Sequence, residues 1–94
     1  MPDWYVYMLR CRDGSLYTGI ATDVERRLAD HLASKGAKYL RGRGPLKLVF
    51  SKKVGEKGQA LKVELQVKRL SRHKKEALIK TGAGIEALLS SNDR

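Results

Sequence analysis

Five side chains of this sequence could act together on one phosphate group: Tyr7, Tyr17, Arg27, His31 and Glu64. An arginine fork matches the oxygens of a phosphate, and a histidine can donate a hydrogen bond or transfer a proton near neutral pH. A glutamate carboxylate is a ligand for hard divalent ions such as Mg²⁺ or Mn²⁺. A phenol can serve as a base where a nearby cation lowers the cost of deprotonation. This set predicts chemistry on a polyanion.

Each of these residue types also has a purely structural explanation. Strand tyrosines are commonly core residues with hydrated hydroxyls, and a single helical arginine is commonly a solvated surface cation. Arg27 and His31 are one helical turn apart, so they share one flank of a helix, at the border between core and solvent. The residue types alone therefore leave both interpretations open.

Glu64 is the least ordinary of the five. On a helical projection it falls inside an apolar arc formed by six residues, Ala60, Leu61, Val63, Leu65, Val67 and Leu70. A carboxylate facing a core needs a partner, because burial of an unpaired charge is costly. One possibility is an ion pair with one of three cationic side chains, Arg27, His31 or Lys68. The other is a divalent metal ion whose remaining positions are filled by water and phosphate.

A strand pair must position the two tyrosines. Residues 4–10 and 16–20 are rich in aromatic and branched side chains, which predicts two strands. Asp13-Gly14 between them is a hairpin signal, so the strands should be antiparallel neighbours with Tyr7 and Tyr17 in one region of the sheet. Gly19 would allow a close approach to the second strand.

Helices and a third strand complete the expected domain. Thr22 and Glu25 form a capping-box pattern, which predicts a helix from Thr22 to about Lys35, stopped by Gly36. The pattern then predicts a strand over 46–53, a helix over 59–70, a helix capped by Ser71 and stopped by Gly82, and one or two further turns over 84–90. The order β-β-α-β-α-α predicts an α+β fold, with a small antiparallel sheet flanked by helices.

Composition limits the class of protein. The 94 residues allow one domain, and we place it at 1–82, followed by a short helical turn and tail over 83–94. No stretch is apolar enough for a membrane span, and no secretory leader precedes the domain. Cys11 is the only cysteine, which excludes an intrachain disulfide and fits the cytoplasm. One cysteine and two histidines also argue against a structural zinc site.

The net charge of +10 is concentrated in one segment. Residues 35–80 contain 15 Lys or Arg and 3 Asp or Glu, a balance of +12, whereas 1–34 and 81–94 each carry −1. Such a field favours a phosphate backbone over a merely solubilising surface, and no amphipathic segment suggests a lipid surface. The expected partner is nucleic acid, contacted by six basic residues and one aromatic residue, Lys35, Lys38, Tyr39, Arg41, Arg43, Lys68 and Arg72.

The ordered combination of Tyr5-Val6-Tyr7, Tyr17-Thr18-Gly19, Arg27, His31 and Glu64 resembles the GIY-YIG nuclease superfamily, and most of all its small stand-alone bacterial members. The resemblance implies a three-stranded antiparallel sheet and hydrolysis of DNA with one divalent metal ion, Mg²⁺ or Mn²⁺, and no small-molecule cofactor. It further implies that Tyr7 is the general base, Tyr17 positions water or phosphate, Arg27 stabilises the pentacovalent phosphate, His31 matches a histidine of some members, and Glu64 binds the metal.

Two positions depart from the pattern of the resemblance. Ile20 stands where several family nucleases have a lysine, and Glu76 falls near the place where some have an asparagine. The chain also lacks anything similar to the DNA-targeting domain of many family nucleases. We therefore retain two alternatives: a DNA- or RNA-binding module that cleaves poorly, with 35–80 as its binding face, and an accessory protein of a nucleic-acid complex.

Overall fold

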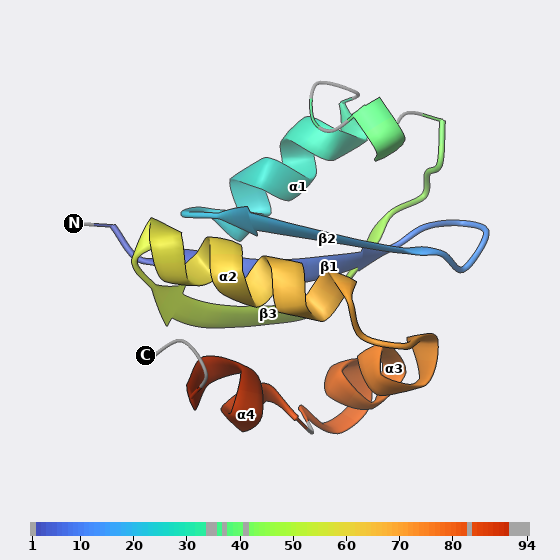
Figure 1. The fold of residues 1–94 in the computed structure, drawn as a ribbon. Helices are drawn as coiled ribbons and strands as arrows, with labels where there is room; N and C mark the ends of the chain where they lie inside the picture. The colour runs from blue at the N-terminus through green and yellow to red at the C-terminus, as the bar shows by residue number, and fades with distance from the viewer. Residues whose placement is uncertain (1, 34–35, 37, 41, 83, 91–94) are drawn as a thin grey trace.

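The protein is described by a computed structural model that covers residues 2–33, 36, 38–40, 42–82 and 84–90. Its three strands form one antiparallel sheet in the order β2-β1-β3, so β1 is central and β2 is an edge strand (Figure 1). The strands are β1 (Trp4–Arg10), β2 (Leu16–Ala21) and β3 (Lys47–Gly55), the helices are α1 (Val24–Leu32), α2 (Lys57–Lys68), α3 (Arg72–Thr81) and α4 (Ile85–Ser90), and η1 (Lys38–Leu40) is one 3₁₀ turn. The predicted α+β fold and its element order are confirmed.

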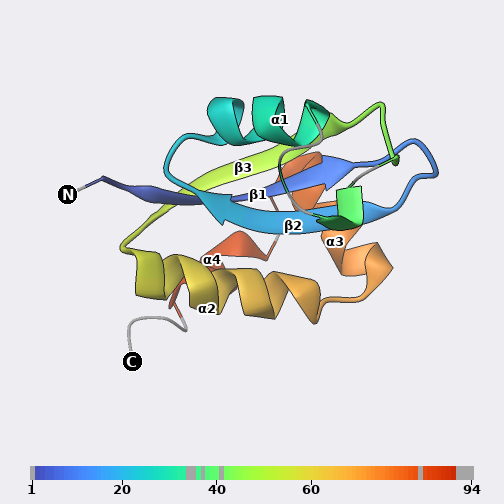
Figure 2. The ribbon, with the colours of Figure 1, turned by 90° about the horizontal axis from the view of Figure 1, so that it is seen from above.

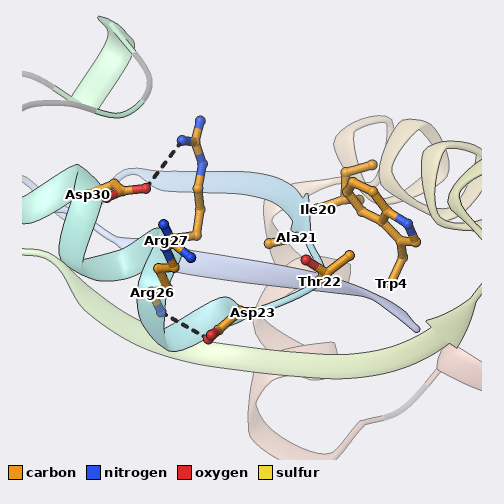
Figure 3. Close-up of a pocket in the computed structure, with 8 residues that line it drawn as sticks. All are labelled: Trp4, Ile20, Ala21, Thr22, Asp23, Arg26, Arg27 and Asp30. Atoms are coloured by element: carbon orange, nitrogen blue, oxygen red, sulfur yellow. Dashed lines mark hydrogen bonds and ion pairs between the residues drawn. The ribbon is translucent and has the colours of Figure 1, made fainter. Parts of the chain in front are cut away.

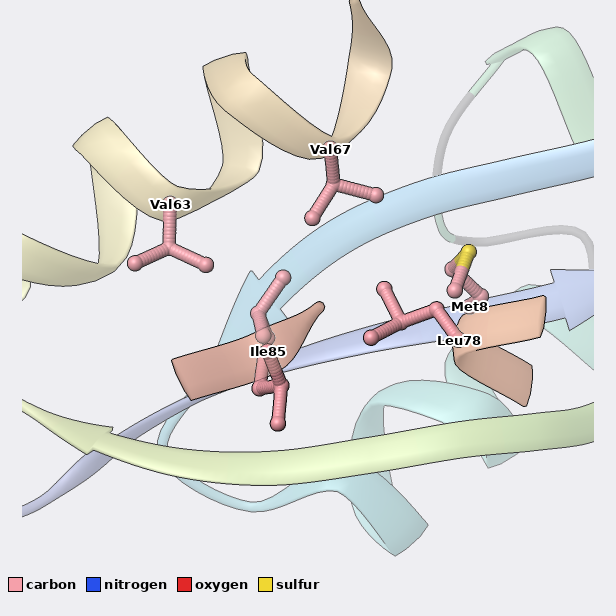
Figure 4. Packing of buried hydrophobic residues seen from close by; sticks show 6 residues of the cluster. Met8, Val63, Val67, Leu78 and Ile85 are labelled. Carbon is pink, nitrogen blue, oxygen red and sulfur yellow. The ribbon is translucent and has the colours of Figure 1, made fainter. Parts of the chain in front are cut away.

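The helices lie on both faces of the sheet, with α1 on one side and α2, α3 and α4 on the other (Figure 2). The strand period of two explains this, because successive side chains of β1 point to opposite faces. Val6 and Met8 pack with residues of the three later helices, whereas Tyr7 and Leu9 pack beneath α1. Figure 4 shows the first cluster, in which Val63 and Val67 of α2 lie over Met8, Leu78 and Ile85.

Side-chain caps fix the beginnings of two helices. Asp23, not Thr22, caps α1, because its carboxylate accepts a hydrogen bond from the backbone N–H of Arg26. The predicted capping box at Thr22 is therefore wrong; adjacent Thr and Asp are both good caps, and the pattern favoured the wrong one. The prediction for α3 is confirmed, since Ser71 caps its start and Gly82 ends it at a φ of 75°.

The length of α1 was overestimated. It ends at Leu32 with Ala33 as its C-cap, whereas the sequence pattern extended it to Lys35. Lys35 itself lies outside the described residues. Among the parts of the chain that the structure describes, no helix has the length and apolar character needed to cross a membrane.

Candidate active site

A buried hydrogen bond joins the central strand to α1. The hydroxyl of Tyr7 lies 2.9 Å from Nε2 of His31, and the two residues are 1% and 3% exposed. His31 was expected at the border between core and solvent, so its full burial corrects that prediction. The hydrogen bond explains how the polar ring is accommodated there, because a buried imidazole needs a partner.

The backbone of β2 leaves room for this pair. Gly19 is the register partner of Tyr7, and a Cβ atom at Gly19 would lie only 2.6 Å from the Tyr7 hydroxyl oxygen and 2.8 Å from Cζ. Gly36 has the same relation to the other partner, because a Cβ there would overlap the ring of His31. Glycine at both positions is therefore a steric requirement of the Tyr7–His31 contact. At Gly19, this agrees with the close approach that the sequence predicts.

Tyr17 links the buried pair to the surface. Its ring centroid lies 6.4 Å from that of Tyr7 and 5.6 Å from that of His31, and its other neighbour is the exposed ring of Tyr39 at 6.0 Å, nearly parallel at 25°. The predicted proximity of Tyr7 and Tyr17 is confirmed. Three aromatic rings thus lead from the interior, through Tyr17, to solvent.

The environment keeps the buried pair neutral. Burial and the neighbouring Tyr17 raise the pKa of Tyr7 from 10.0 to about 12, against the opposing effect of Arg27. Burial, reinforced by the positive charge of Arg27, lowers the pKa of His31. Near pH 7 the histidine is therefore an uncharged imidazole that can accept a proton, and the phenol keeps its own.

Arg27 lies beside the pair on α1 and remains accessible. Its side chain is partly exposed and makes a weak contact with Asp30, at 3.9 Å between Nη1 and Oδ2. An exposed ion pair of that length contributes little stability. The guanidinium is therefore available to an anion that approaches the edge of β2.

Glu64 reaches the same edge from α2 on the other face of the sheet. Its side chain is 19% exposed, and its negative charge helps to raise the pKa values of both Tyr7 and Tyr17. Lys68 is its ion-pair partner, at 3.5 Å between Nζ and Oε2, which is one of the three pairs that the sequence allowed. Leu61 and Leu65 are 46% and 50% exposed, so the apolar arc is narrower than predicted and Glu64 lies at its border.

The donor set at Glu64 suits a hard divalent ion held mainly by substrate and water. Among the described residues no group of three or more His, Cys, Asp or Glu side chains converges, so a site enclosed by protein ligands does not form there. Mg²⁺ accepts one or two protein carboxylates when phosphate oxygens complete its coordination. Glu64 offers one carboxylate that is partly accessible and that pairs with an exposed lysine, which fits this mode.

The predicted nucleic-acid residues fall into two groups. Lys38 is exposed on η1, and Arg43 lies over the ring of Tyr39 at 4.2 Å while pairing with Asp13 at 3.2 Å. The predicted residues Lys35 and Arg41 lie outside the described residues. Tyr39 on η1 therefore contacts both Tyr17 and Arg43, and Arg43 joins this segment to the β1–β2 turn through Asp13.

Arg72 and Glu76 have a different environment. Glu76 receives two hydrogen bonds from Arg10, at 2.9 and 2.7 Å, and one from Arg72 at 2.8 Å, and Arg72 also donates to the carbonyl oxygen of Gly14. These bonds hold the pKa of Glu76 down at about 2. The network attaches α3 to the β1–β2 hairpin. Arg72 and Glu76 therefore stabilise the fold through these hydrogen bonds.

Two clefts open along edge strand β2, one at each end. The first, of about 360 Å³, is lined by residues 16–18 and by Tyr39, Lys68 and Lys75. Lys75 was not among the predicted contacts, although it belongs to the basic run 72–75. The second, of about 420 Å³, is lined by residues 20–23 together with Trp4 and side chains of α1 that include Arg27. Gly19, beside the Tyr7 hydroxyl, lies between them.

Comparison with known proteins identifies the family of this chain. Residues 3–77 match the model of the GIY-YIG catalytic domain. The chain belongs to the GIY-YIG family. UPF0213 proteins of Citrobacter koseri and, under the name YhbQ, of Escherichia coli K12 are each 53% identical over 91 residues, covering 97% of this chain and 91% of the relative.

Solved structures of similar proteins have the same fold. The solution NMR structure of the UPF0213 protein BH0048 from Bacillus halodurans is 50% identical, covers 89% of this chain and 90% of that one, and has a TM-score of 0.55. The NMR structure of EF2693 from E. faecalis is 38% identical, covers 86% of each chain and has a TM-score of 0.60. This protein is thus a small GIY-YIG domain that matches its relatives over almost their full length.

Proposed function

We propose that this protein is a divalent-metal-dependent nuclease that hydrolyses phosphodiester bonds of DNA at the edge of β2. The observation that carries the proposal is the cluster of Tyr7, Tyr17 and the neutral His31, with an arginine and a glutamate close enough to shift the pKa values of both tyrosines. The GIY-YIG membership of the chain supports the same class of reaction.

The Tyr7–His31 pair would accept the proton of the attacking water. Water would transfer a proton to the Tyr7 oxygen while Tyr7 transfers its own to Nε2 of His31, so no phenolate with a pKa of about 12 has to form beforehand. The water oxygen forms a bond to phosphorus as the bond to the leaving oxygen breaks, and the leaving oxygen takes a proton from the surrounding water. Because Tyr7 is 1% exposed, neighbouring groups would have to move for the attacking water to reach its hydroxyl.

Arg27 would stabilise the charge that develops on the phosphate oxygens. It lies one turn from His31, and its weak contact with Asp30 can be exchanged for phosphate. Glu64 would hold Mg²⁺ or Mn²⁺, and such an ion supplies Lewis-acid stabilisation of the same phosphate. Tyr17 would position the water or phosphate between these groups.

A second candidate is a nucleic-acid-binding module with little or no cleavage. The burial of Tyr7 and its raised pKa favour it, since both hinder a base that must touch water. The basic side chains around the first cleft, Lys68 and Lys75, would serve binding equally well.

Cleavage assays separate the two candidates. Labelled single-stranded, duplex and branched DNA are incubated with Mg²⁺ or Mn²⁺ and with wild-type protein, Glu64→Ala or Tyr7→Phe. Metal-dependent cleavage by the wild type that both variants lose supports the nuclease. Binding without cleavage in either metal supports the module, and cleavage that survives in both variants refutes the assigned site.

A further inference from the structure

The cleft at the far end of β2 combines two unlike walls. Trp4 and Ile20 form one side, Arg26 and Arg27 extend from α1 on the other, and Thr22 lies between them (Figure 3). Arg27 also borders the candidate active site, so the cleft and the site share one guanidinium.

These walls suit a nucleotide better than a simple anion. An aromatic ring beside an aliphatic side chain provides a surface on which a planar base can stack, and two guanidinium groups match the phosphates on either side of its sugar. The volume of about 420 Å³ is open rather than enclosed, as a subsite for one unit of a chain requires.

The acidic side chains of the cleft do not prevent a nucleotide phosphate from binding there. Asp23 is engaged as the N-cap of α1, where it accepts from the backbone of Arg26. Asp30 contacts Arg27 at 3.9 Å, and an incoming phosphate can replace this contact. A further cation, Lys57, lies over the ring of Trp4 at 5.2 Å from its centroid.

The position of the cleft along β2 indicates the path that a single strand of nucleic acid would take. Residues 16–18 line the first cleft, residues 20–23 line the second, and Gly19 beside Tyr7 lies between them. A single strand that crosses the active site along this edge therefore enters a cleft on each side of the scissile phosphate.

We propose that Trp4 is the stacking platform for an unpaired base adjacent to the scissile phosphate, with Arg26 and Arg27 binding the neighbouring phosphates. This inference rests on the proposed function and adds a preference for single-stranded or splayed nucleic acid. An unpaired base is required because the two faces of a base inside a duplex are already covered by its neighbours.

Trp4 is the only tryptophan of the chain, so tryptophan fluorescence reports binding at this side chain. In EDTA, which prevents cleavage, the protein is titrated at low salt with fluorescein-labelled oligothymidylate and with the same phosphodiester chain without bases. Binding of both is followed by anisotropy, and stacking by Trp4 emission. We expect both chains to bind and only the chain with bases to quench Trp4.

Variants separate the two walls. Trp4→Ala should weaken binding of oligothymidylate by between about fivefold and about a hundredfold, the range that stacking on one aromatic side chain supplies, and leave the chain without bases unaffected. Trp4→Phe should restore most of the affinity, which guards against loss of folding. Arg26→Gln should weaken both chains alike, because it removes only a phosphate contact.

The outcomes also distinguish this inference from the function on which it rests. If oligothymidylate binds without quenching Trp4, or Trp4→Ala weakens both chains equally, the stacking subsite is refuted while the nucleic-acid function stands. If neither chain binds at low salt, both proposals fail.

Discussion

Two glutamates on neighbouring helices occupy opposite electrostatic environments. Glu76 on α3 is held by Arg10 and Arg72 through three hydrogen bonds of 2.7–2.9 Å. Glu64 on α2 faces two tyrosines and has one lysine at 3.5 Å. The first carboxylate is saturated with cations from the protein itself. The second is partly accessible and has one lysine partner among the described residues, which is the environment expected for a carboxylate that takes an external cation.

The largest difference between the two should appear on removal of their charges. Glu64→Gln should reduce metal-dependent cleavage by between about a hundredfold and about a thousandfold, because the residue acts on the developing phosphate charge through the metal ion. Glu76→Gln should lower the Tm and leave cleavage intact. Both are measured by cleavage assay and thermal unfolding. If Glu76→Gln loses cleavage while folded, the two carboxylates do not differ as described.

The steric requirement at Gly19 offers a test of the candidate active site that does not involve the Glu76 network. Gly19→Ala should reduce cleavage by up to about a hundredfold, because the new methyl group displaces the Tyr7 hydroxyl from its present position. Gly58→Ala is the matched control: it has open space around its Cβ, lies in α2, and should stabilise the helix by about 0.5–1 kcal/mol without affecting cleavage. Equal activities of the two variants would show that the close approach is not needed.

The site and the α3 network should also respond to opposite extremes of pH. The pKa of Tyr7 is raised from 10.0 to about 12, so its stabilising contribution is complete below pH 10 and is lost as the pH rises through 12. This amounts to about 2–3 kcal/mol, at 1.36 kcal/mol per unit. Urea unfolding of wild type and Tyr7→Phe between pH 9 and about pH 12 measures it, and parallel curves would refute the raised pKa.

At low pH, the loss of folding stability should depend on Glu76. Its pKa is lowered to about 2, so the stability that it contributes is present above its ordinary pKa of 4.5 and is lost as the pH falls through 2. The effect should be smaller than that of Tyr7 because the carboxylate is exposed and screened. We expect Glu76→Gln to show a flatter decrease in Tm than the wild type below pH 4.5, and an unchanged slope would contradict the network.

The sequence predicted those parts of the molecule that depend on local pattern. The strand pair, the Asp13-Gly14 turn and the caps at Ser71 and Gly82 follow from residue type and spacing over a few positions. The meeting of Tyr7 and Tyr17 followed in turn, because adjacent antiparallel strands joined by a short turn allow few registers.

The remainder depends on contacts between residues distant in sequence. Arg10 and Glu76 are 66 positions apart, and no local pattern indicates that they meet. The burial of His31 follows from the packing of α1 over Tyr7, and the narrow buried face of α2 leaves Leu61 and Leu65 exposed. These features needed the tertiary arrangement.

The most direct test of the account is to locate a bound divalent ion. Mn²⁺ added to isotopically labelled protein broadens the NMR signals of nuclei close to it, so a titration maps the ion onto the chain. The account predicts selective broadening around Glu64 and the adjacent residues of β2, retained in Glu76→Gln and abolished in Glu64→Gln. Broadening around Glu76, or an unchanged map in Glu64→Gln, would contradict the assignment of Glu64 as the metal ligand.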